Sequence, residues 1–104
     1  MPLTRDFKST VMHRARKDKK FCEAMLAEAM NELLTGDPEV GKAVLRDYIN
    51  ATISFTVLSE MLEKNPKSVM RMLSPGANPT SNSLFAILQI IQKLRKVRFR
   101  VIVK

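Results

Sequence analysis

The side chains best suited to chemistry in this sequence are cations, and they gather in its last two-fifths. Residues 64–104 contain nine lysines and arginines and no acid, whereas residues 1–63 contain nine cations and ten acids. The net charge of +8 therefore comes entirely from the C-terminal part of the chain. A soluble surface normally mixes both signs. A long stretch of one sign indicates a localised site for a polyanion.

Three of these cations surround one short predicted helix, which Asn65 can cap and Pro66 can begin. Helical spacing then gives an inner face with Val69, Met72 and Leu73 and an outer face with Lys67, Ser68 and Arg71. Cationic and polar side chains at this end of a helix are those that reach base edges and phosphates in a major groove. Met70 lies beside Arg71, where it either touches a thymine methyl group or packs against a neighbouring helix.

Another short helix is predicted just before this one. Leu58, Met61 and Leu62 form its inner face, Ser59 is small, and Glu60 and Glu63 lie outside. Two short helices joined by a tight turn, the second amphipathic with cations on its free face, match the spacing of a helix-turn-helix. The same cations would also suit an ordinary solvated surface, but the missing acids favour a nucleic-acid site.

The other elements that position this site are predicted to be helical. Apolar residues recur at helical spacing in four further segments: 3–11, 21–34, 40–49 and 84–94. Gly36 suits a left-handed position after a helix end, Asp37 an N-cap and Pro38 a first helical turn. No linker divides the chain. We expect one mostly α, compact domain over 1–104, with N-terminal helices in 1–50, the helix-turn-helix and a closing helix in 51–96, and a strand in 97–104.

The strand is predicted from alternation at the C-terminus. Phe99, Val101 and Val103 alternate with Arg98 and Arg100. No other segment alternates well enough to pair with it, so its backbone needs a second chain. A symmetric homodimer that pairs two tails antiparallel would supply it, and so would a strand from a partner protein. The six cations from residue 93 onward either hold flanking phosphates or keep the strand edge soluble.

Several classes of function are disfavoured. The longest apolar run, Leu84 to Leu88, is far too short to span a membrane. The first residues lack the apolar stretch of a signal peptide, so a cytoplasmic location is expected. Cys22 and His13 are the only residues of their types, and no nucleophile or metal partner is evident beside them. We therefore expect no enzyme activity, no metal and no cofactor.

One string in the C-terminal half resembles a known family. The segment from Lys67 to Pro75, followed by Gly76, Asn78-Pro79 and Leu84-Phe85, resembles the addiction-module antidote proteins, the HigA-like antitoxins with a lambda-repressor-like helix-turn-helix. The resemblance extends to residues 41–51 and 3–7. It implies an antitoxin that binds a RelE-like toxin, binds double-stranded operator DNA and represses its own operon.

The resemblance also assigns roles to particular positions. It makes Asn65, Lys67, Ser68 and Arg71 the contacts of the recognition helix, and Lys64 and Asn78 candidates for phosphate contacts. The sequence departs from the family at Glu63, where a turn glycine is usual. A left-handed backbone there would cost on the order of 1 kcal/mol. The acids of residues 1–63 are a candidate toxin-facing surface, although solvated helix faces account for them equally well.

The predicted function is a sequence-specific DNA-binding repressor, the antitoxin of a toxin-antitoxin module. The alternative is a non-enzymatic interaction module that neutralises a partner and binds nucleic acid without sequence choice through its basic C-terminal part.

Overall fold

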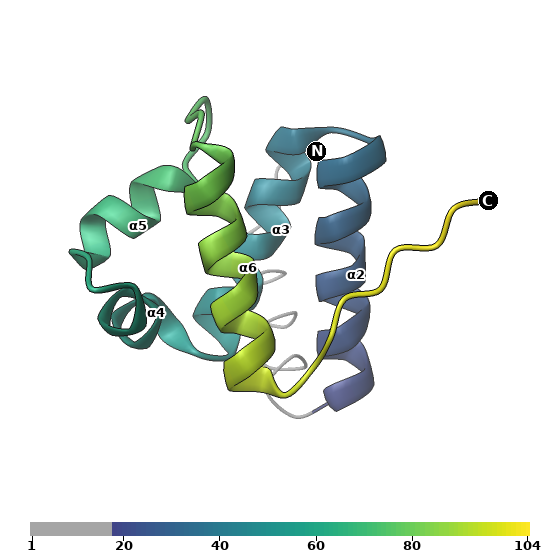
Figure 1. Ribbon diagram of the computed structural model, residues 1–104, viewed down its shortest axis with the longest axis horizontal. Coiled ribbons are helices and arrows are strands. Elements are labelled where there is room, and N and C mark those ends of the chain that lie inside the picture. The colour runs from purple at the N-terminus through teal and green to yellow at the C-terminus, as the bar shows by residue number, and fades with distance from the viewer. Residues whose placement is uncertain (1–17) are drawn as a thin grey trace, which may run out of the picture.

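The computed structural model describes residues 18–104, and the described residues are mostly helical, as the sequence predicts. Figure 1 shows the arrangement of the helices, which are α2 (Lys19–Thr35), α3 (Pro38–Ala51), α4 (Ser54–Leu62), α5 (Pro66–Met72) and α6 (Ser81–Arg95). The helix expected over residues 3–11 lies outside the described residues. None of the described helices is long and apolar enough to cross a membrane.

A tight connection folds α3 back against α2. The Asp37 carboxylate accepts a hydrogen bond from the Glu39 amide at 2.9 Å, and Pro38 occupies the first turn of α3, as predicted. Gly36 is not left-handed, contrary to the prediction, because its φ and ψ are −121° and −125°. A Cβ atom there would lie 2.5 Å from Glu32 Oε2, the end of a flexible side chain that would have to move. That carboxylate accepts a hydrogen bond from the Asp37 amide and occupies the space.

Gly41 allows α2 and α3 to approach closely. A Cβ atom at this position would lie 2.7 Å from Leu33 Cγ and 3.0 Å from the Ala29 carbonyl oxygen. The two helices form one layer, and α4, α5 and α6 complete the bundle (Figure 1). A single hydrophobic cluster joins side chains from all five helices, including Ala29, Leu45, Leu58, Val69 and Ile87.

The C-terminal residues 97–104 do not form a strand in the single chain. They leave the end of α6 and run in an open, extended path across α2 (Figure 1). Val97 and Phe99 are half-buried against the core, whereas Arg98 and Arg100 are exposed, so burial alternates as expected of a strand. Phe99, Val101 and Val103 are the residues predicted to pair in a dimer. Phe99 packs against the core of its own chain, whereas Val101 and Val103 are exposed. Pairing with a second chain stays a prediction.

Candidate nucleic-acid interface

Helices α4 and α5 are joined by a tight turn over residues 63–65. The Lys64 amide donates to the Ser59 carbonyl at 3.0 Å and the Glu63 amide donates to the Glu60 carbonyl at 3.1 Å. These two bonds form a Schellman motif, which ends a helix by satisfying its last carbonyls. The Asn65 side chain then accepts from the Lys67 amide at 2.8 Å and caps α5. The turn therefore ends one helix and starts the next within three residues.

Glu63 adopts a left-handed conformation, the case considered above because the resembled family usually has a turn glycine at this position. Its φ and ψ are 56° and 43°. A side chain with a Cβ atom is strained there by about 1–2 kcal/mol relative to glycine. This strain lies at the junction of α4 and α5.

We expect Glu63→Gly to stabilise the protein by about 1 kcal/mol, because it relieves this strain at the cost of some unfolded-state entropy. Urea denaturation measures the change. Lys96→Gly is the matched control, since Lys96 ends α6 in the same conformation, with φ 55° and ψ 43°. Both changes should raise the midpoint of unfolding. A drop in stability for Glu63→Gly alone would show that its side chain contributes more than its backbone costs.

Helices α4 and α5 share the core. Ser59 of α4 is buried, and its hydroxyl donates to the Phe55 carbonyl at 2.5 Å, so its polar group is satisfied within the helix. Leu58 of α4, Val69 of α5 and Leu73, which follows α5, are completely buried in the same hydrophobic cluster. One face of α5 is thereby fixed in the core, and the opposite face is left to solvent.

The turn and the outer face of α5 present most of the residues assigned to DNA. The exposed side chains in this surface are Lys64, Asn65, Lys67, Ser68 and Arg71. Three of these side chains are cations, Lys64, Lys67 and Arg71, and within the described part of the chain none of the three has an ion-pair partner. Met70 is 46% exposed on α5, so it does not fill the core. Asn78 is exposed in the loop that follows α5. The predicted outer face of α5 is therefore exposed, and Val69 and Leu73 are buried as predicted. Met61, predicted on the inner face of α4, is instead 43% exposed. Contacts of these residues with DNA stay predictions.

Two cations from α3 hold the loop after α5, and the sequence analysis did not identify them. Lys42 is only 4% exposed, and its ammonium donates to the carbonyls of Ser74 at 3.3 Å and Ala77 at 2.6 Å. The Arg46 guanidinium donates to the carbonyl of Leu73, the residue that ends α5. Cations that meet the last carbonyls of a helix stabilise its C-terminus. Helix α5 is thus fixed to α3 at this end.

Glu39 completes this clamp. Its carboxylate is 2.6 Å from the Lys42 ammonium and accepts a hydrogen bond from the Gly76 amide at 3.0 Å. These contacts, the one with Lys42 above all, lower the pKa of Glu39 below its ordinary value of 4.5. A carboxylate with a lowered pKa stabilises the fold above its unfolded pKa and loses that contribution as the pH falls through the folded value. The Glu39 carboxylate is therefore ionised at neutral pH.

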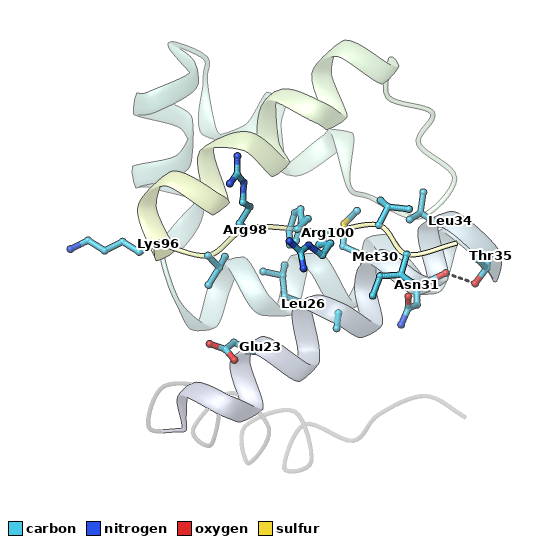
Figure 2. Close-up of a pocket in the computed structure, with 14 residues that line it drawn as sticks. Glu23, Leu26, Met30, Asn31, Leu34, Thr35, Lys96, Arg98 and Arg100 are labelled. Atoms are coloured by element: carbon cyan, nitrogen blue, oxygen red, sulfur yellow. Dashed lines mark hydrogen bonds between the residues drawn. The ribbon is translucent and has the colours of Figure 1, made fainter. Parts of the chain in front are cut away.

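The remaining cations lie away from α5. Arg95 is half-buried, and its guanidinium hydrogen-bonds the Tyr48 side chain. Burial raises the pKa of Tyr48 above its ordinary value, and the nearby guanidinium reduces this increase. Lys96, Arg98 and Arg100 follow along the tail across α2 (Figure 2). Figure 1 shows that the tail leaves the end of α6, crosses α2 and ends on the side of the molecule opposite α5.

The described residues include no group of three or more histidine, cysteine, aspartate or glutamate side chains placed to hold a metal ion. Cys22 is buried in α2. Comparison of the chain with family models, with curated proteins and with solved structures returns no match in any of the three.

Proposed function

We propose that the protein binds double-stranded DNA sequence-specifically, with α5 as the recognition helix, and acts as a transcriptional repressor. One observation carries the proposal. A short helix is buried along one face, held at both ends, and carries Lys67, Ser68 and Arg71 on the other face with no acid on the helix. Rigid placement matters because base readout depends on holding donors against base edges.

The exposed side chains divide into two expected roles. Arg71 and Lys67 suit the O6 and N7 acceptors of guanine in the major groove, and Arg71 can donate two parallel hydrogen bonds. Lys64 in the turn and Asn78 in the loop suit backbone phosphates, which position a protein without reading sequence. The side-chain oxygen of Asn65, Oδ1, already caps α5. A contact of Asn65 with DNA would therefore come from its side-chain nitrogen, Nδ2.

Acids border the surface on one side. Glu60 and Glu63 are exposed at the end of α4, next to the turn. Carboxylates repel phosphates, so they would direct the duplex toward α5 and the following loop. Two copies on two half-sites would give the symmetry that helix-turn-helix proteins commonly use.

The test compares DNA from upstream of the protein's own coding sequence with a scrambled duplex of the same length and composition. At a fixed salt concentration we expect the upstream DNA to bind about a thousandfold or more tightly, as specific sites do. Equal affinities would favour the alternative, an interaction module that binds nucleic acid without sequence choice.

The resemblance of residues 67–75 to addiction-module antidote proteins supports a further part of the proposal. In this part the protein is an antitoxin that neutralises a RelE-like toxin and represses the operon that encodes both. The acids of residues 1–63, such as the exposed Glu23 and Glu28 of α2, are the candidate toxin-facing surface. A short reading frame beside this one, whose product is toxic alone and harmless with this protein, is the expected genetic result.

A further inference from the structure

A groove lies between the C-terminal tail and α2, on the side of the molecule away from α5. It has a volume of about 780 Å³, and Figure 2 shows it bounded by the helix on one side and by the extended tail on the other. Leu26, Met30 and Leu34 line it from α2, and Val101 and Ile102 line it from the tail. Val101 is 77% exposed, and Val103 beyond it is 91% exposed. Apolar side chains this open to water form a surface that binding would cover.

One backbone edge of the tail is used and the other is free. Gln92 of α6 anchors the start of the tail, because its carbonyl accepts from the Val97 amide at 3.1 Å and its side-chain oxygen accepts from the Phe99 amide at 2.9 Å. In an extended chain the amides of alternate residues point to the same edge. The amides of Arg98 and Ile102 therefore face the other edge, where residues 18–104 offer no partner.

An edge of this kind is a template for an added strand. Peptides bind to exposed edges through main-chain hydrogen bonds, and pockets for alternate side chains give specificity. The tail carries Lys96, Arg98, Arg100 and Lys104 as exposed cations, and no acid follows residue 63 in the chain. The added strand must therefore match a cationic tail beside a groove whose α2 wall is mostly apolar but also carries Glu23, Asn31 and Thr35. Carboxylates of the added strand must accordingly meet the tail and not the α2 wall.

A second copy of the tail does not meet this requirement. In a two-fold antiparallel pair that keeps both apolar faces together, even-numbered residues lie opposite even-numbered residues. One such register places Arg98 opposite Lys104, the next places Arg100 opposite itself, and the next places Arg98 opposite Arg100. Like charges directly opposite each other destabilise a strand pair. Acidic side chains at the same positions would turn each repulsion into an attraction.

We infer that residues 98–104 form a docking edge for an acidic, extended segment of a different protein. The segment adds to the tail as a β-strand, its carboxylates meet Arg98 and Arg100, and its alternate apolar side chains enter the groove against α2. This site is separate from the proposed DNA surface. A failure of DNA binding would leave it untouched.

The test measures binding of a labelled synthetic peptide that alternates glutamate with valine to the whole chain. Fluorescence anisotropy of the labelled peptide reports the binding. We expect binding that Arg100→Glu weakens by about tenfold or more, because it turns an attraction into a repulsion. Lys93→Glu is the matched control, since it makes the same charge change on an exposed residue of α6 outside the tail. Its effect on peptide binding should stay within about twofold.

Proline variants test the backbone pairing. Ile102→Pro removes an amide from the free edge and should abolish binding, whereas Val101→Pro removes one from the opposite edge and should reduce it less. A peptide with methylated backbone amides should not bind. Equal binding of the methylated peptide, or no binding of the parent peptide, would overturn the inference. Preference for single-stranded polyuridylate would make the edge a nucleic-acid site, and a dimer that Ile102→Pro dissociates would make the partner a second copy. Either result would also overturn it.

Discussion

Replacing Arg71 by alanine is expected to weaken binding to the preferred duplex by about 1–3 kcal/mol, the usual contribution of a good base contact. Arg71 lies exposed on the outer face of α5, where the described residues offer its guanidinium no carboxylate. Because nothing in the fold depends on its head group, the substitution should leave the thermal unfolding midpoint nearly unchanged. Anisotropy titrations against labelled duplex at one salt concentration measure the loss.

Arg98→Ala is the matched control for this experiment. It removes the same side chain from the exposed tail, on the opposite side of the molecule from α5. Both variants lower the net charge equally, so a purely non-specific electrostatic attraction would weaken by a similar amount in both. A loss confined to Arg71→Ala supports the recognition helix. Equal losses, or none, would remove Arg71 from the interface.

Replacing Lys42 by methionine is expected to destabilise the fold by about 2–3 kcal/mol. Methionine keeps most of the buried aliphatic chain but leaves the carbonyls of Ser74 and Ala77 without the ammonium that they accept from. The ion pair with Glu39 adds little to this figure, because that carboxylate is half-exposed to water. Urea denaturation gives the free energy of unfolding, and amide exchange should quicken in residues 73–77.

Lys93→Met supplies the comparison for the clamp. It makes the same substitution on an exposed part of α6 and should change stability by less than about 0.5 kcal/mol. Lys42→Met should also weaken DNA binding, because the C-terminal end of α5 loses its attachment to α3. If both methionine variants unfold at the same urea concentration, the buried ammonium does not hold the loop in solution.

Local signals in the sequence predicted the elements around the site well. Asp37 and Asn65 have short side chains that cap a following helix wherever the backbone allows it, so both caps were readable. The apolar spacing of Val69 and Leu73 predicted which face of α5 is buried. The left-handed conformation of Glu63 was raised only as a condition, from the turn glycine usual in the resembled family, and no local signal at Glu63 predicted it.

Long-range contacts were not readable in the same way. Lys42 meets carbonyls that lie 32 and 35 residues further along the chain, and nothing in its neighbours distinguishes it from a solvated lysine. Its spacing from Glu39 and Arg46 on α3 was the only available sign. The tail shows the opposite case. Its alternation was correctly recognised, but a ladder of hydrogen bonds needs a partner, and the single chain supplies only Gln92.

Selection from a library of randomised duplexes tests the central claim most directly, because it assumes neither the operator nor the genetic context. The intact protein and the Arg71→Ala variant would be selected in parallel at the same salt concentration. The account predicts that the intact protein enriches a defined sequence and that the variant loses preference at one position of each half-site. No enriched sequence for the intact protein, or the same sequence at the same strength for both proteins, would contradict it.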